Sequence, residues 1–281
     1  MKLGQIVWNK KLTAAVFSAD GAHPIPDHTL QDLIMRAEKE NETLESLAHA
    51  MKRPHAEKCE PTIPIKPREV WACGCTYEMS ASFRDAEHNT REGFYAAVYK
   101  GDRPEVFFKG TARVCVGPNE PIGIRYDSKF TAPEPELAVI LGSKGKILGY
   151  TLANDVSAWD IERENPLYLP QSKTYTACCS LGPVIITADE IPDARTLEMS
   201  CTIMRGATQT FHGTTSTSKL GRTIETLVEW LMRANDVPAG SVLMTGTGII
   251  VTQEAALAEG DVVTIGVPQF GELKNPAVIV K

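Results

Sequence analysis

The chain has 281 residues and a mass of 30.7 kDa, so it is long enough to bury a large core and to form one large domain with a smaller one. Its formal net charge of -6 and its pI near 5.6 give no basic footprint, which makes nucleic acid and anionic membrane surfaces poor candidate partners. The N-terminal residues lack the apolar core of a signal peptide, and no apolar run approaches the length of a membrane span. We therefore expect a cytoplasmic protein.

Residues 1–66 are expected to form a small α+β domain that ends in a linker. Short apolar runs predict a strand pair at Gln5–Trp8 and Thr13–Ser18. A helix should follow, because apolar residues recur at helical spacing at Leu30, Leu33, Ile34 and Ala37, and a second apolar set runs from Leu44 to Met51. The segment from His55 to Arg68 has three prolines and little periodicity, so we place the domain boundary near residue 66.

From residue 67 to residue 281 the pattern changes to short β-strands. The runs, most of them bounded by Gly, Pro, Asn or Asp, are V-W-A-C-G-C-T-Y, E-V-F-F-K, E-L-A-V-I-L-G, I-L-G-Y-T-L-A-N-D, G-P-V-I-I-T, M-S-C-T-I-M, S-V-L-M-T-G-T, D-V-V-T-I-G-V and A-V-I-V. Many short strands in one long region predict a mixed, β-rich α+β fold of the sandwich or roll type. The clearest helices are expected at Ser80–Tyr99 and Thr223–Ala234.

The cysteines do not suggest a metal site. There are seven: Cys59, Cys73, Cys75, Cys115, Cys178, Cys179 and Cys201. An odd number without a secretory signal favours reduced thiols, and neither the C-x-C nor the C-C pair matches the C-x-x-C pairs of zinc sites. We interpret these side chains as small buried hydrophobes.

Two glutamates stand one residue apart in T-A-P-E-P-E-L-A-V-I-L-G, Thr131 to Gly142. The prolines favour an extended backbone, so Glu134 and Glu136 should point the same way. Two carboxylates on one face repel each other unless a divalent cation lies between them. The alternative is a solvated edge strand, where alternating glutamates are common.

A third carboxylate should join this pair. After the first strand, G-S-K-G-K makes a turn, and a return strand ending at A-N-D can bring Asp155 back beside the two glutamates. Three carboxylates without His or Cys suit Mg²⁺, Mn²⁺ or Ca²⁺. The alternative role of Asp155 is a helix N-cap, because N-D-V-S precedes a plausible helical turn.

Two further segments carry candidate chemistry. Lys173 stands alone among aromatic, small and apolar residues in Glu164–Pro183. A lysine usually reaches solvent, but in a dry pocket near a cation its pKa would fall and it could act as a base or a proton donor. In M-T-G-T-G, Gly246 and Thr247 end a strand, where backbone N–H groups and a hydroxyl could bind a carboxylate. The alternative there is an ordinary turn.

Together, P-E-P-E-L-A-V-I-L-G, G-Y-T-L-A-N-D-V-S-A-W-D-I-E, L-P-Q-S-K, G-P-V-I and T-G-T resemble the fumarylacetoacetate hydrolase superfamily from about residue 69 to the end of the sequence. The resemblance implies a β-roll catalytic domain, often dimeric, with Mg²⁺ or Mn²⁺ held by Glu134, Glu136 and Asp155. The family lysine corresponds to Lys173. The threonine that holds the substrate carboxylate corresponds to Thr247.

The branch of the family is indicated by the motifs that this chain carries and by a histidine that it lacks. Hydrolases and decarboxylases usually carry Y-A-D-H-A, whereas this chain has C-T-Y-E-M-S-A-S, with no histidine after Tyr77 at that spacing. The segments T-Y-E, R-P-E-V-F-F-K and E-N-P-L-Y-L-P-Q-S-K instead resemble the 2-keto-3-deoxy-D-arabinonate dehydratase branch. Trp159 departs from the family pattern N-D-V-S-A-R-D, which has arginine there. His88 could replace the missing histidine, but a solvated helix face is the simpler interpretation.

The resemblance leads to a mechanistic hypothesis for a small-molecule 2-keto acid substrate. The metal would stabilise the keto oxygen while neutral Lys173 removes a C3 proton, and the enolate would expel the C4 hydroxyl as water. For the five-carbon acid the product would be 2,5-dioxopentanoate. Our first candidate for the general acid is Glu78, and Glu105 is a weaker one; either would need burial to raise its pKa. Tyr77 and Lys109 are candidates for substrate binding.

Two alternatives remain open. The first is C–C hydrolysis of an acylpyruvate, or decarboxylation of a 2-keto diacid, with the same enolate chemistry. The second is a non-catalytic β protein stabilised by a metal, which would have no use for Lys173.

Overall fold

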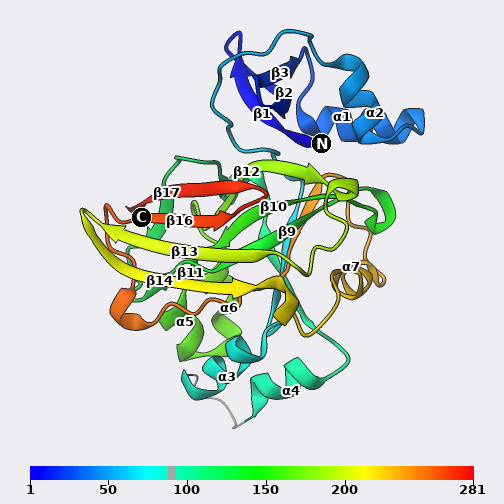
Figure 1. The fold of residues 1–281 in the computed structure, drawn as a ribbon. Helices are drawn as coiled ribbons and strands as arrows, with labels where there is room; N and C mark the ends of the chain where they lie inside the picture. The colour runs from blue at the N-terminus through cyan, green and yellow to red at the C-terminus, as the bar shows by residue number, and fades with distance from the viewer. Residues whose placement is uncertain (88–92) are drawn as a thin grey trace.

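The computed structural model describes residues 1–87 and 93–281, and its strands form three sheets (Figure 1). The strands are β1 (Lys2–Trp8), β2 (Lys11–Ser18), β3 (Gly21–Ile25), β4 (Val70–Gly74), β5 (Glu105–Gly110), β6 (Cys115–Val116), β7 (Ile122–Arg125), β8 (Thr131–Ala132), β9 (Pro135–Leu141), β10 (Ile147–Asp155), β11 (Ser157–Ala158), β12 (Cys179–Thr187), β13 (Glu198–Arg205), β14 (Thr208–Ser216), β15 (Ser241–Met244), β16 (Val262–Val267) and β17 (Gly271–Val280). The α-helices are α1 (Leu30–Glu40), α2 (Leu44–Met51), α3 (Glu78–Glu87), α4 (Phe94–Lys100), α5 (Trp159–Glu164), α6 (Leu169–Lys173) and α7 (Ile224–Met232).

The largest sheet runs in the order β3-β2-β1-β12-β10-β9-β15-β4-β5, with β6 paired to β12 at one side. A five-stranded sheet has the order β14-β13-β16-β17-β7, and a two-stranded sheet joins β8 to β11. The expected mixed, β-rich α+β fold is therefore confirmed.

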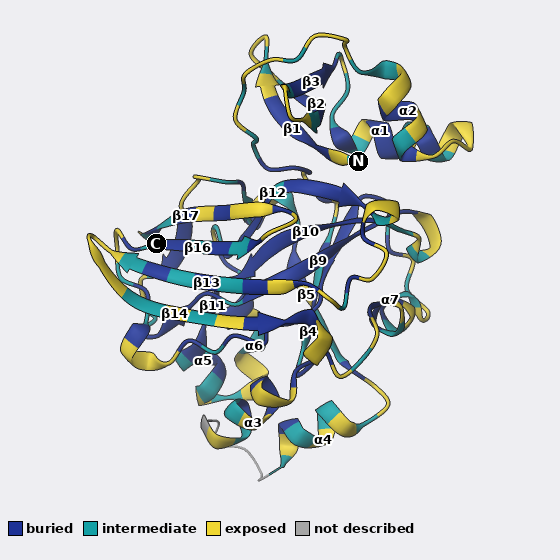
Figure 2. Ribbon diagram, in the orientation of Figure 1, coloured by how far each residue is buried: buried dark blue, intermediate teal, exposed yellow. Residues whose placement is uncertain are grey.

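The core lies between the two large sheets. Val139 on β9 and Leu152 on β10 share one hydrophobic cluster with Ile203 on β13 and Ile265 on β16. Strand β9 is buried along its whole length, which explains why its sequence is almost continuously apolar rather than alternating (Figure 2). A carboxylate placed on such a strand is therefore withdrawn from bulk water.

The two expected helical regions differ in how closely they match. Helix α7 begins after its N-cap Thr223, whose side chain accepts from the N–H of Thr226, and it buries the expected apolar face. The region Ser80–Tyr99 contains two helices, α3 and α4, rather than one. His88 lies outside the described residues.

The N-terminal unit does not have a sheet of its own. Strands β1 and β2 match the expected pair, and β3 adds a third strand. Strand β1 also pairs with β12 through Lys2–Ile186 and Leu3–Ile185, so the main sheet continues into this unit. The boundary near residue 66 stays a prediction.

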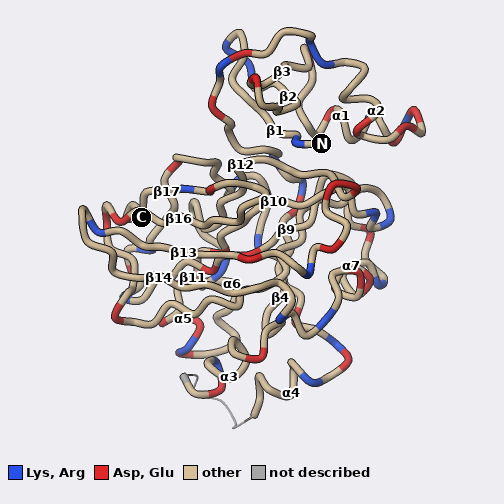
Figure 3. The backbone as a smooth tube through the Cα atoms, in the orientation of Figure 1, with Lys and Arg blue, Asp and Glu red and all other residues tan. Residues whose placement is uncertain are grey.

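Charge does not mark one face of the molecule. Along the described chain, lysine and arginine positions are interspersed with aspartate and glutamate (Figure 3). None of the described helices is long and apolar enough to cross a membrane. The distribution of charged residues along the chain therefore does not locate a functional site, and we turn to the charged side chains that are buried.

Candidate active site

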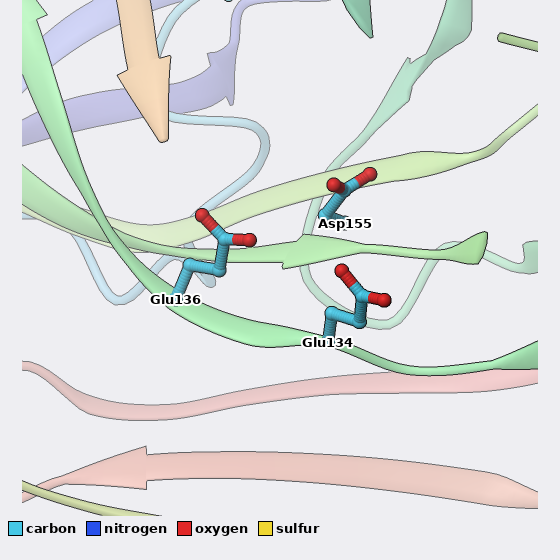
Figure 4. Close-up of side chains that lie close together, drawn as sticks. All are labelled: Glu134, Glu136 and Asp155. Carbon is cyan, nitrogen blue, oxygen red and sulfur yellow. The ribbon is translucent and has the colours of Figure 1, made fainter. Parts of the chain in front are cut away.

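Three carboxylates converge at the junction of β9 and β10 (Figure 4). One oxygen from each of Glu134, Glu136 and Asp155 lies within 4.8 Å of the other two. The antiparallel hairpin brings them together, since the N–H of Asp155 donates to the carbonyl of Glu134 over 2.9 Å. Asp155 ends β10 and does not cap a helix, because the N-cap of α5 is Ala158. The expected convergence is confirmed.

These carboxylates fit a divalent cation. Burial raises the pKa of Glu136 well above its usual value, and the neighbouring charges of Asp155 and Glu134 raise it further. The donors are all carboxylate oxygens, the ligand type that Mg²⁺, Mn²⁺ and Ca²⁺ prefer. A cation of this kind would offset the mutual repulsion of the three groups.

Each carboxylate is held by donors from other parts of the chain. Glu134 accepts from the indole Nε1 of Trp159 on one oxygen and from Nζ of Lys173 on the other, both at 2.8 Å. Glu136 accepts from the backbone N–H of Gly246 at 2.5 Å. The ligand group is thus oriented before any cation binds.

Lys173, at the end of α6, lies among acidic groups. Its side chain is 2% exposed, and its Nζ is 3.1 Å from Asp155, 3.7 Å from Glu162 and 2.7 Å from Oγ of Ser157. Burial lowers the pKa of Lys173, but Asp155, Glu134 and Glu162 raise it well above its usual value. The dry pocket that we expected is present, and the three carboxylates around the ammonium group favour its charged form.

Lys109 lies against a carboxylate of the proposed ligand group. It is fully buried on β5, and its Nζ is 2.5 Å from Oδ1 of Asp155 and 3.1 Å from the carbonyl of Val156. Burial lowers the pKa of Lys109, while Asp155 raises it above its usual value. Lys109 and Lys173 therefore contact one oxygen each of Asp155. The suggested substrate-binding role of Lys109 stays a prediction.

The T-G-T turn is only partly arranged as expected. Thr247 lines a small cavity together with Glu134, Asp155, Lys173, Gly74 and Arg84. The N–H of Gly246 is directed at Glu136 rather than into this cavity. Tyr77 is buried, and its ring lies so close to Gly248 that an added Cβ on this glycine would contact it. Burial and the charge of Glu136 raise the pKa of Tyr77, although Arg195 opposes them.

The two candidates for the general acid have different surroundings. Glu78 begins α3 and is exposed, so the burial that the role requires is absent at this position. Glu105 begins β5, is 22% exposed, and pairs with Nη1 of Arg84 at 2.7 Å. Its carboxylate occupies the space beside Gly74 that a Cβ there would fill.

Sequence reasoning missed two charged residues of this site, Arg84 and Glu162. Both are buried and form an ion pair, and Oε2 of Glu162 also accepts from Ser172 at 3.1 Å. Helical spacing could have found them. Arg84 shares a buried face of α3 with Ser80 and Ala81, and Glu162 follows the buried Trp159 by three residues on α5.

Comparison with known proteins agrees with this geometry. A family model described as fumarylacetoacetate (FAA) hydrolase C-terminal matches residues 77–278. A 2-dehydro-3-deoxy-D-arabinonate dehydratase of Saccharolobus solfataricus is 47% identical over 219 residues, which is 76% of this chain and 73% of the relative. A probable 2-keto-3-deoxyxylonate dehydratase of Haloferax volcanii is 44% identical over 219 residues, or 78% and 75%.

A solved structure gives the same result for the whole chain. It is a 2-keto-3-deoxy-D-arabinonate dehydratase complexed with magnesium and 2,5-dioxopentanoate. The match has a TM-score of 0.84 and 37% identity, and covers 100% of both chains.

Proposed function

The chain belongs to the fumarylacetoacetate hydrolase family, and we propose that it is a magnesium-dependent dehydratase of a 2-keto-3-deoxy sugar acid. The proposed substrate is 2-keto-3-deoxy-D-arabinonate, and the product is 2,5-dioxopentanoate. The observation that carries this proposal is a buried Lys173 paired with two of the three clustered carboxylates, Glu134 and Asp155, in a chain 47% identical to a dehydratase of this type.

The reaction removes a proton from C3 and the hydroxyl group from C4, so that one water is lost. Glu134, Glu136 and Asp155 would hold Mg²⁺, which supplies a Lewis acid for the keto oxygen when it is bound. The unsaturated product then tautomerises to 2,5-dioxopentanoate without gain or loss of atoms.

Lys173 is the proposed base for the C3 proton. Its Nζ lies within hydrogen-bond distance of Glu134, Asp155 and Ser157, and these contacts fix its position. Serving as a base requires Lys173 to give up its proton, which becomes easier as the negative charge around it is compensated. Thr247, on the same cavity, is the proposed contact for the substrate carboxylate.

Glu105 is the general acid that the geometry favours over Glu78. Its carboxylate packs against Gly74, a residue of the cavity wall, and it is withdrawn from bulk water far more than the exposed Glu78. The ion pair with Arg84 also fixes its direction. We therefore propose that Glu105 donates the proton that allows the C4 hydroxyl to leave as water.

The cavity is small in this conformation. Its volume of about 10 Å³ is roughly what one water molecule needs. A five-carbon acid therefore requires the lining side chains to move apart when it enters.

The competing function is C–C hydrolysis or decarboxylation, which uses a histidine to activate water. Among the described residues, no histidine lines this cavity. The surroundings of Lys173 therefore support dehydration better than hydrolysis.

The proposal is tested by a ¹H NMR time course with Mg²⁺ and 2-keto-3-deoxy-D-arabinonate, beside an EDTA control and an acylpyruvate sample. We expect the aldehyde signal of 2,5-dioxopentanoate to grow only in the sample with metal. Release of pyruvate from the acylpyruvate, with the sugar acid intact, would show that the chain is a hydrolase.

We also propose a homodimer or larger homo-oligomer located in the cytoplasm, as the family resemblance implies. Sedimentation velocity over a range of protein concentrations measures the oligomeric state. A species with the mass of one chain at all concentrations would contradict it.

A further inference from the structure

We propose that Trp159 is a positioning residue of the metal site, and that its indole N–H sets the affinity for Mg²⁺ by holding one oxygen of Glu134. The inference depends on the metal site of the proposed function. It concerns the position at which this chain carries tryptophan and the family pattern carries arginine.

Glu134 is held at both oxygens of its carboxylate. Oε1 accepts from Trp159 at 2.8 Å, and Oε2 accepts from Lys173 at 2.8 Å. Its backbone N–H donates to Oδ1 of Asn154 over 3.0 Å. The carboxylate is thus fixed at both oxygens and at its own backbone, which leaves it little freedom to rotate.

Trp159 can impose this orientation because it is itself immobilised. Its side chain is 4% exposed, and its backbone N–H donates to the carbonyl of Phe130 over 2.8 Å. The indole meets the ring of Phe83 edge to face, with centroids 5.2 Å apart, and lies 6.1 Å from that of Phe130. The donor direction is therefore set by packing rather than by the carboxylate.

The chemistry of the donor explains its effect on a cation. An indole N–H donates one hydrogen bond and carries no charge. It orients Glu134 without placing a second positive charge beside it, so it does not weaken the attraction of the carboxylates for a divalent ion. Partners of this kind, outside the ligands themselves, typically contribute about 10- to 100-fold in metal affinity.

The inference also connects the metal site to α3. Phe83 belongs to α3, the helix that carries Arg84 as well, and Arg84 pairs with Glu105 and Glu162. One helix therefore supports both the indole that holds Glu134 and the proposed general acid.

The experiment is a calorimetric titration of Mg²⁺ into metal-stripped protein without substrate. We expect Trp159→Phe, which keeps an aromatic ring but removes the N–H, to bind Mg²⁺ about 10- to 100-fold more weakly than the parent. Its turnover should recover at saturating Mg²⁺, because Trp159 orients a ligand and does not touch the reacting atoms.

Trp71→Phe is the matched control, since the indole of Trp71 donates over 2.8 Å to Glu69, a carboxylate that is not one of the three proposed ligands. Its Mg²⁺ affinity should stay at the parent value. Loss of affinity in this control as large as in Trp159→Phe would overturn the inference.

A second variant separates the lost hydrogen bond from lost packing. Benzothienylalanine at position 159, introduced by nonsense suppression, replaces the N–H by sulfur in a ring of nearly the same shape. It should reproduce the loss of affinity even if Trp159→Phe folds poorly. Parent-like affinity in this variant would overturn the inference and leave the proposed function standing, whereas a parent that binds no Mg²⁺ would overturn both.

Discussion

Lys173 and the three carboxylates depend on each other for burial. A buried charge without a partner costs several kcal/mol, and Lys173 forms ion pairs with both Glu134 and Asp155. Nζ of Lys173 is therefore both the proposed base and the positive charge that balances these carboxylates.

Replacing this lysine separates the two roles. We expect Lys173→Met to lose turnover and to destabilise the metal-free protein by about 3–5 kcal/mol, because carboxylates are left buried without their cation. Saturating Mg²⁺ should restore most of the stability but none of the activity. Urea unfolding with and without Mg²⁺ measures the first effect, and the exposed Lys39→Met is the control. Normal turnover in Lys173→Met would exclude it as the base.

The identity of the general acid is a second question at the scale of single residues. We expect Glu105→Gln to lower kcat by about 10²- to 10⁴-fold, the usual contribution of a positioned acid, with a smaller change in KM. Glu78→Gln should have the smaller effect of the two, because Glu78 is exposed. Steady-state kinetics on both variants decides between them, and a larger loss in Glu78→Gln would reverse the assignment.

At the scale of elements, the turn after β15 controls a metal ligand. Gly246 has a φ of +94°, and an added Cβ would collide with Oγ1 of Thr76, whose hydroxyl donates to the carbonyl of Thr245 over 2.8 Å. This backbone conformation directs the N–H of Gly246 at Glu136. The element therefore needs glycine for a reason unrelated to binding a substrate carboxylate.

Gly246→Ala tests this role of the turn. We expect it to weaken Mg²⁺ binding and to lower stability by more than the roughly 1 kcal/mol that alanine costs at a strained φ. Gly260→Ala is the matched control, because its φ is +86° but no atom lies within 4 Å of the new Cβ. Equal urea midpoints and equal Mg²⁺ affinities in the two variants would show that the collision with Thr76 is unimportant.

At the scale of the whole molecule, the main sheet passes through the predicted domain boundary. Besides the β1–β12 pairing, Nε2 of Gln31 donates to the carbonyl of Ala239. The N-terminal unit thus covers an edge of β12 that would otherwise be an unpaired, apolar strand edge.

Removing residues 1–66 should therefore be costly. We expect the shortened chain to aggregate or to unfold at a lower temperature, since the backbone of β12 would lose partners on one side. Light scattering and a thermal melt beside the full chain measure this. A soluble fragment with the melting temperature of the parent would show that residues 67–281 do not need the N-terminal unit for their stability.

The sequence by itself determined the chemistry of the ligand group and the family. Alternation along P-E-P-E and one short hairpin are local features, so spacing indicated that Glu134, Glu136 and Asp155 could converge. The family resemblance then favoured this group over a solvated edge strand and a helix N-cap. The short β-runs likewise predicted a sheet-rich fold, because each strand is defined by its own residues.

Only the tertiary structure decided which groups support those carboxylates and which acid is buried. Trp159, Gly246 and Lys109 come from segments separated in the chain, and their donors meet the ligands only after the sheets have packed. The exposure of Glu78 and the partial burial of Glu105 depend on neighbours remote in sequence. Burial and hydrogen-bond direction are properties of the packed chain, so no local pattern could have given them.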